Sequence, residues 1–332
     1  MKINYLIFTA LTLLSFSCTN DKVDLLSNFD NCELGIDSFS IISINNDTMW
    51  NFLTCNYNEE YFGNDKNINN VVPSPLDSNS ISYLKFTYGP SNCFLKVFDL
   101  CTGEIFETDG VECTELDWSI NDWILFRKNN SLFKMKPNGD SLIELSQIPN
   151  NSQFFKWSAD GSKITYHKSA GINSKFVIAN ENLEEISDIE ELKYIGIYEW
   201  TSNNNIYVVS GTDSMTYGIY KYDLQSEEFT PIHIVNFEHL IHDISINETS
   251  QIIYYSSTSG VYQYDLDLNQ SIQLLNQTSN RTYEGAINII EDDKLLTIRQ
   301  NKTLVTPCYV EVIEKINFYN PINNIEKELT IE

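Results

Sequence analysis

Short segments of alternating apolar and polar residues recur along most of this chain. Clear examples are residues 94–99, 219–223 and 261–265. A period of two places neighbouring side chains on opposite faces of a β-strand, whereas an amphipathic helix requires a period near 3.6. A polar turn and a further short apolar segment follow most of these examples, as at residues 228–232. The pattern therefore predicts antiparallel strands, and residues 71–331 contain no segment of convincing helical length.

The predicted strands belong to a repeat. Its clearest unit covers residues 155–166, a near copy covers residues 116–126, and weaker copies lie at both ends of the region. Each unit contains a hydroxyl or equivalent polar residue, and successive examples are 45, 39, 43, 44 and 43 residues apart: Ser74, Ser119, Ser158, Thr201, Ser245 and Asn288. Four strands per unit are typical of a propeller blade. Six units predict an all-β fold, a six-bladed β-propeller of four-stranded antiparallel blades over residues 71–332.

The first turn of the third repeat carries a Trp-Ser-x-Asp-Gly motif at residues 157–161. This motif resembles the WD40-like repeat of the TolB-type propeller family, and the turn at residues 138–140 also fits that family. The chain departs from true WD40 repeats, because it has no Gly-His and no Trp-Asp pair. The resemblance implies that the Trp packs between blades while Ser, Asp and Gly hold the turn. The residues concerned are Trp118, Ser119, Trp157, Ser158, Asp160, Gly161 and Trp200.

The first residues of the chain indicate export. Lys2 is the only charged residue before position 18, an apolar run covers residues 5–14, and small residues precede Cys18. This order is typical of a secretory signal. It resembles the lipobox of bacterial lipoproteins, although Ser15 stands where Leu is usual. The resemblance implies a signal peptide at residues 1–17 and lipidation of Cys18, with an ordinary secretory signal as the alternative.

Two segments separate the predicted lipidation site from the repeats. Residues 18–34 are expected to form a tether. Residues 35–70 contain strand-like patterns at 38–44 and 49–53. These could add an outer strand or hairpin to the ring, or form part of a seventh blade. We favour the outer strand, because the last repeat is complete and an unpaired blade edge invites association.

The charge of the chain restricts its partners. The 332 residues include 21 Lys and Arg against 46 Asp and Glu, which gives a net charge of −25. A chain with this much negative charge cannot neutralise phosphates over a broad surface. We therefore expect no nucleic-acid partner. Membrane contact is expected only through the N-terminal lipid. The Asn-rich composition and the acidic residue soon after Cys18 resemble lipoproteins of the Bacteroidota, which implies an outer-membrane lipoprotein facing the periplasm or the cell surface.

Export also bears on the seven cysteines. Lipidation of Cys18 would leave six, an even number in an oxidising compartment. We favour two pairings, because the partners flank the same predicted segment: Cys32 with Cys55, and Cys101 with Cys113. Buried free thiols are the alternative.

Candidate chemistry is sparse. No G-x-S-x-G, P-loop, G-x-G-x-x-G or H-E-x-x-H motif occurs, so we predict no catalytic residue, no enzymatic activity and no required cofactor. His239, His242 and Asp243 enter the first strand of the fifth repeat, where two imidazoles and a carboxylate could bind a divalent metal. Their alternative role is that of ordinary polar residues.

Several aromatic residues fall in predicted loops, where they suit binding to a protein or a sugar. They are Tyr57, Tyr61, Phe62, Tyr88, Tyr217 and Tyr283. We therefore predict a lipid-anchored, non-enzymatic propeller that binds an envelope or surface protein. The alternative is a carbohydrate-binding or carbohydrate-active propeller whose site lies at the mouth of the central channel.

Overall fold

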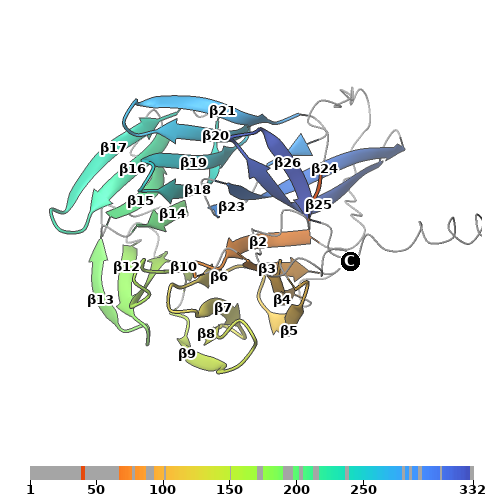
Figure 1. The fold of residues 1–332 in the computed structure, drawn as a ribbon. Coiled ribbons are helices and arrows are strands. Elements are labelled where there is room, and N and C mark those ends of the chain that lie inside the picture. The colour runs from red at the N-terminus through yellow and green to blue at the C-terminus, as the bar shows by residue number, and fades with distance from the viewer. Residues whose placement is uncertain are drawn as a thin grey trace, which may run out of the picture.

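The computed structural model of the protein is a ring of six β-sheets (Figure 1). It describes these residues: 39–41, 67–76, 79–86, 93–100, 102–149, 151–169, 175–189, 197–201, 205–211, 217–235, 239–278, 281–283, 286–290, 294–306 and 309–329. Every regular element among them is a strand. The predicted six-bladed β-propeller with four antiparallel strands per blade is confirmed. No helix in this part of the chain is long and apolar enough to cross a membrane.

Each of the first five blades is a four-stranded antiparallel meander. The first contains β2 (Asn67–Pro73), β3 (Ser80–Phe86), β4 (Cys93–Asp99) and β5 (Ile105–Val111). The second contains β6 (Leu116–Trp118), β7 (Ile124–Lys128), β8 (Ser131–Met135) and β9 (Ile143–Gln147). The third contains β10 (Ser152–Trp157), β11 (Lys163–Lys168), β12 (Lys175–Asn180) and β13 (Glu185–Ile189).

The fourth and fifth blades repeat this order. The fourth contains β14 (Ile197–Trp200), β15 (Asn205–Gly211), β16 (Tyr217–Asp223) and β17 (Glu228–Ile234). The fifth contains β18 (Ile241–Asn247), β19 (Ile252–Ser257), β20 (Gly260–Asp265) and β21 (Gln270–Asn276). The first strand of each blade lines the centre of the ring and the last lies outside. Burial follows this order: four of the five residues of β13 are exposed, whereas four of the six in β12 are buried.

The sixth blade is larger. Its inner edge is formed by β22 (Arg281–Thr282) and β23 (Ile287–Ile289), which both pair with β24 (Leu295–Thr306). β24 pairs with β25 (Tyr309–Asn320), β25 with β26 (Ile325–Leu329), and β26 with β1 (Phe39–Ile41). The two 12-residue strands β24 and β25 project from the side of the ring (Figure 1). β1 is therefore an additional strand on the outer edge of a blade whose other strands follow the fifth blade in sequence.

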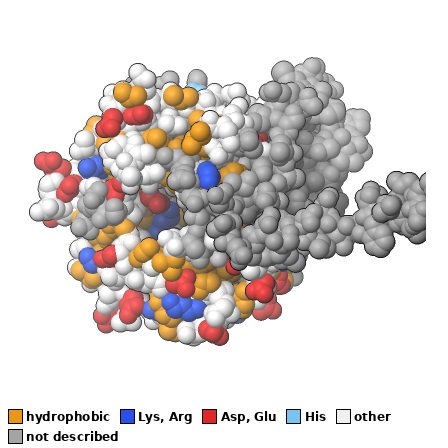
Figure 2. All heavy atoms as spheres, viewed as in Figure 1, with side chains coloured by type: hydrophobic (Ala, Val, Ile, Leu, Met, Phe, Trp, Pro, Cys, Tyr) orange, Lys and Arg blue, Asp and Glu red, His pale blue; other side chains and the backbone are white. Residues whose placement is uncertain are grey.

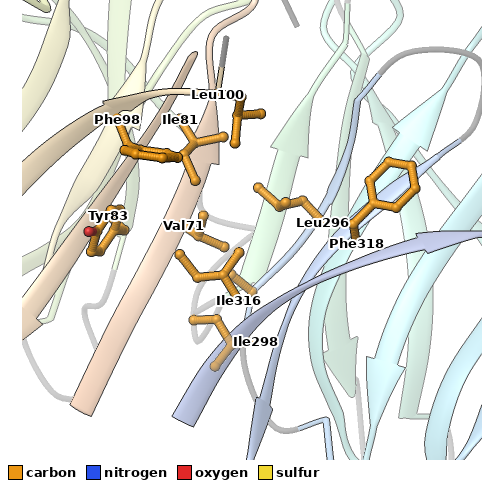
Figure 3. Packing of buried hydrophobic residues seen from close by; sticks show 10 residues of the cluster. Val71, Ile81, Tyr83, Phe98, Leu100, Leu296, Ile298, Ile316 and Phe318 are labelled. Carbon is orange, nitrogen blue, oxygen red and sulfur yellow. The ribbon is translucent and has the colours of Figure 1, made fainter. Parts of the chain in front are cut away.

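Six apolar clusters hold the ring together, one between each pair of neighbouring blades. The cluster between the first and sixth blades closes the ring, and Figure 3 shows Val71 of β2 next to Ile316 of β25. Trp118, Trp157 and Trp200 lie in three successive clusters, between blades one and two, two and three, and three and four. Burial of such large side chains is the main favourable term in folding.

The repeat begins and turns at slightly different residues from those expected. β2 begins at Asn67, four residues before the predicted boundary. In the fifth and sixth blades, Ser245 and Asn288 lie two residues before the turn, which is closed by the pair Asn247 and Ile252 and by the bond from Ile290 N to Lys294 O. The expected marker was wrong there, because both polar residues belong to the channel wall instead.

One predicted disulfide is wrong. Cys113 bonds to Cys93, with Cα atoms 5.7 Å apart, and not to Cys101. Cys93 opens β4 and Cys113 follows β5, so antiparallel pairing brings both to the same end of the hairpin. The seven residues of β5 separate Cys113 from the turn after β4 by about 20 Å, which no disulfide can span. The signal peptide, the tether with Cys18, and the predicted pair Cys32 and Cys55 lie outside the described residues.

Candidate functional site

The candidate site is the central channel of the ring. A cavity of about 460 Å³ is lined by residues of the first strands of all six blades. Its walls carry four carboxylates and one amine: Glu115, Asp117, Glu199, Asp243 and Lys156. With the neighbouring histidine neutral, four negative charges and one positive charge leave the lining at −3. Figure 2 shows basic and acidic side chains next to each other in the recess near the middle of the visible face.

Geometry explains why polar side chains gather here. The first strand of each blade is an edge strand, so its amides on the side away from the blade have no partner strand. Burying such an amide without an acceptor costs free energy. A side chain from the preceding blade supplies the acceptor. Trp157 N donates to Asp117 Oδ2 over 2.6 Å, and Phe154 N donates to Glu115 Oε1 over 3.3 Å.

The same arrangement recurs between the fifth and sixth blades. Ile287 N donates to Asp243 Oδ2 over 3.0 Å, and Ile289 N donates to Ser245 Oγ over 3.1 Å. At the closure, Asn288 Nδ2 donates to the carbonyl of Val71 over 2.6 Å. Three of the four carboxylates in the channel therefore hold neighbouring blades together.

Lys156 and Glu199 have a different environment. Lys156 Nζ lies 3.3 Å from Glu199 Oε2, and the two side chains keep 31% and 34% of their surface exposed. Burial opposes the charged form of Lys156, but the charges of Glu199, Asp243 and Asp117 outweigh it and raise the pKa of the amine. Lys156 therefore stays protonated at neutral pH and balances part of the negative charge of the channel.

The channel carboxylates are less acidic than ordinary ones. Burial raises the pKa of Asp117 to about 6, against the opposing effects of Lys156 and the Trp157 amide. Burial likewise raises the pKa of Asp243 to about 6. The pKa of Glu115 is also raised by burial, although Thr114, Arg127 and the Phe154 amide oppose this. The charge of the channel therefore changes near pH 6.

The sequence analysis singled out Asp243 among the charged residues of the channel and missed Glu115, Asp117, Lys156 and Glu199, as well as Phe154. Phe154 is the aromatic residue among those it missed. Its side chain is 40% exposed although it lines the cavity. It has a positive φ of 60°, at the irregularity in register between Gln153 and Lys156. Its carbonyl accepts a short hydrogen bond from Tyr198 Oη of the next blade. A non-glycine residue in this backbone region is uncommon, and the alternating pattern gives no sign of the bulge that produces it.

The structure does not assemble the predicted metal ligands. In the described ranges, no group of three or more His, Cys, Asp and Glu side chains could hold a metal ion. His239 Nδ1 lies 2.8 Å from Ser259 Oγ, and Asp243 accepts the amide of Ile287. His242 and Asp243 line the channel, whereas His239 precedes β18 and does not. The prediction fails because His239 lies before the strand and contacts Ser259, while the carboxylate of Asp243 already accepts an amide of the next blade.

Trp157 is the last residue of β10, and Ser158, Asp160 and Gly161 of the motif lie in the turn between β10 and β11. Ser158 Oγ donates to Asp160 Oδ1 over 2.6 Å, and the amide of Lys163 donates to Ser158 Oγ over 2.9 Å. Gly161 has a φ of 67°, and its amide donates to the carbonyl of Ser158. In the second blade, Ser119 Oγ accepts the amide of Trp123 in the corresponding turn. These bonds lie within the turns, so the motif residues hold local structure.

The two predicted loop aromatics that the structure describes are not free surface groups. Tyr283 is 1% exposed and donates to Glu326 Oε1 over 3.0 Å. Tyr217 is half-buried, and its hydroxyl accepts the amide of Ile241 over 2.9 Å. The other four lie outside the described residues. Among the described aromatics, Phe154 is the one that combines high exposure with a place in the channel wall.

The fold and the channel define the protein as a six-bladed β-propeller with a charged central cavity. No family model matches the sequence. No curated protein matches it either.

Two solved structures that superpose with a TM-score above 0.5 support the fold. The β-propeller domain of the Trilobed protease from Pyrococcus furiosus, described as having an open velcro topology, superposes with a TM-score of 0.54 at 12% identity, over 81% of this chain and 97% of that one. Acylaminoacyl peptidase from Pyrococcus horikoshii gives 0.54 at 12% identity, over 86% and 54%. TolB from Acinetobacter baumannii gives 0.47 at 11% identity, over 80% and 55%. The chain therefore spans about half the length of the last two.

Proposed function

We propose that the protein is a non-enzymatic binding module that binds a partner protein at its central channel. The observation that carries this proposal is the exposed side chain of Phe154 in the wall of a charged cavity. Protein interfaces are enriched in aromatic residues at their centres. Glu115, Asp117 and Asp243 already accept backbone amides, so they serve the ring, while Phe154, Lys156 and Glu199 present surface to a ligand.

We further propose where the module works. Lipidation of Cys18 would hold the propeller at the outer membrane, and the net charge of −25 gives no attraction to anionic lipid. The partner would then be a protein of the envelope or the cell surface. The TolB-type resemblance of residues 157–161 supports an envelope setting by analogy of fold alone.

A glycan is the second candidate ligand. Phe154 could stack on a sugar ring, and Lys156 with Glu199 could bond to hydroxyl groups. The net charge of −3 in the lining would disfavour an acidic glycan and favour a neutral one.

Site-specific photocrosslinking tests the proposal. Phe154→p-benzoylphenylalanine places the crosslinker in the channel wall and keeps an aromatic side chain there. Ile186→p-benzoylphenylalanine is the matched control, because Ile186 is 57% exposed on the outer strand β13. We expect one envelope protein to crosslink from position 154 and not from position 186.

The captured protein is then purified and its binding to the propeller is measured directly. Lys156→Glu should weaken that binding at least about tenfold, since it reverses the charge beside Glu199. Equal crosslinking from both positions, or binding insensitive to Lys156→Glu, would reject the channel as the site. Capture of oligosaccharide without protein would favour the glycan alternative.

A further inference from the structure

The disulfide between Cys93 and Cys113 lies directly before the channel wall. Cys113 is followed by Thr114 and Glu115, both of which line the cavity, and β6 begins one residue later. Cys93 belongs to the first blade and is 2% exposed. The disulfide therefore ties the start of the second blade to the first, four residues before Asp117.

The residues after this tie hold the third blade. Glu115 is 5% exposed and accepts the amide of Phe154, and Asp117 accepts the amide of Trp157. Both amides belong to the channel edge of β10. A shift of residues 114–117 would therefore alter two hydrogen bonds and the position of the exposed Phe154.

Glu112, directly before Cys113, is attached to the second blade. Glu112 Oε2 lies 2.6 Å from Arg127 Nε, and Glu112 N donates to the carbonyl of Arg127 over 2.7 Å. Loss of the disulfide therefore removes the cross-link between Cys113 and Cys93, while Val111 still pairs with Cys93 and Glu112 still contacts the second blade. The expected consequence is a local change in the channel wall while the ring stays folded.

We propose that the disulfide is a redox-sensitive clamp that fixes the channel wall between the first and third blades. In the oxidised protein Glu115 and Asp117 are held against β10. In the reduced protein this wall loosens and the two amides of β10 open more often. The inference does not depend on the proposed binding function, because its test needs no partner.

Reduction requires an external dithiol. A thiolate of the dithiol attacks Sγ of Cys113, which is more exposed than Cys93, and Cys93 leaves as a thiolate that takes up a proton. The second thiolate of the reagent then displaces Sγ of Cys113, which is protonated in turn. Two electrons pass to the protein, which gains two thiols, and the dithiol becomes a cyclic disulfide.

The ring contains its own control. Between the fifth and sixth blades, the amides of Ile287 and Ile289 donate to Asp243 and Ser245 in the same way. The sequence contains no cysteine between positions 113 and 308, so no disulfide lies within that stretch. Reduction should therefore change the amides of Phe154 and Trp157 and leave those of Ile287 and Ile289 unchanged.

Amide hydrogen exchange, resolved to single residues, tests the clamp. We would compare the oxidised protein, the protein reduced with dithiothreitol, and the Cys93→Ser/Cys113→Ser variant. We expect exchange at Phe154 and Trp157 to become about tenfold faster or more in the last two samples, since a bond to a charged acceptor is lost. A Cys101→Ser variant with the clamp intact should behave like the oxidised protein.

Two results would overturn the proposal. If no amide changes on reduction, the disulfide does not fix the wall. If all four amides accelerate equally, the disulfide is only a general stabiliser of the fold. Thermal unfolding of each sample, followed by far-ultraviolet circular dichroism, checks the second result, because a general loss of stability would lower the melting temperature.

Discussion

We call the contact between two neighbouring blades a seam. Two seams, between blades two and three and between blades five and six, satisfy the channel-edge amides with different residues. In both, a carboxylate of one blade accepts a channel-edge amide of the next: Asp117 bonds to Trp157, and Asp243 bonds to Ile287. The first seam also contains a buried Trp157, a Trp-Ser-x-Asp-Gly turn and a disulfide nearby, whereas the second has Ile289 and a serine. We call such a side-chain acceptor, together with the amide it accepts, a bridge. Both seams contain bridges but only one contains the Trp-Ser-x-Asp-Gly motif, so the ring requires the bridge and not the motif.

The largest difference in stability between the seams should come from the side chain of the residue that donates its amide next to the turn. Trp157 and Ile289 each lie one residue before the turn of their blade. Trp157→Ala should lower the free energy of unfolding by about 3–5 kcal/mol, because a fully packed indole leaves a large cavity. Ile289→Ala, at a partly buried position, should cost about 2 kcal/mol. Denaturant unfolding of both variants checks this, and equal losses would show that the motif adds nothing to its seam.

The turns of the two seams should differ next. Gly161 has a φ of 67°, and an added Cβ would lie 2.6 Å from Nδ2 of Asn121, which bonds to the carbonyls of Asp160 and Gly161. Gly161→Ala should therefore cost about 2 kcal/mol, through backbone strain and the displaced amide. The first turn of the fifth blade, on the earlier side of the second seam, already contains Gln251 at a φ of 55°.

Gln251→Gly is the matched opposite change. It should be neutral or stabilise by less than about 1 kcal/mol, because glycine relieves the left-handed backbone at the cost of unfolded-chain entropy. Thermal unfolding of the two variants measures both effects. A destabilising Gln251→Gly together with a harmless Gly161→Ala would contradict the assignment of the first-turn strain.

The two carboxylate bridges should respond to pH in the same direction. The pKa of Asp117 and of Asp243 is raised from 3.8 to about 6, so between these values the folded state binds more protons than the unfolded state. The free energy of unfolding should therefore increase as pH falls from 7 to 4, with about 1–2 kcal/mol from each group. Asp117→Asn and Asp243→Asn keep an acceptor oxygen for the amide and should each flatten this dependence.

Denaturant unfolding at several pH values between 4 and 7 measures this effect. The double variant should lose most of the slope in this interval. If Asp117→Asn flattens it and Asp243→Asn does not, the two seams differ in charge environment although both carboxylates accept a channel-edge amide. A wild-type protein that instead becomes less stable from pH 7 to 5 would contradict burial as the main cause of both shifts.

The sequence could predict the ring but only part of its centre. Alternation and spacing define all six blades, because every blade buries the same strands. The bridges were missed although their spacing follows the repeat: Asp117 and Trp157 are 40 residues apart, and Ser245 and Ile289 are 44. Acceptors one repeat before an edge amide are therefore a usable signal. The bulge at Phe154 and the pairing of Cys93 with Cys113 depend on strand register, which alternation alone does not determine.

The smallest effect should distinguish a neutral from a charged bridge. Ser245 Oγ accepts the amide of Ile289 at the place where Asp117 accepts that of Trp157. Ser245→Ala removes one neutral acceptor and should cost about 1 kcal/mol, whereas Asp117→Ala removes a charged one and should cost about 2 kcal/mol. Ser245→Asp should keep an acceptor for the amide of Ile289 but add a fifth carboxylate to a channel that already carries four.

We therefore expect Ser245→Asp to be as stable as wild type at pH 5 and less stable at pH 8, as measured by denaturant unfolding at both values. A variant equally stable at the two values would show that the channel, and with it the balance between Lys156 and its neighbours, tolerates further negative charge.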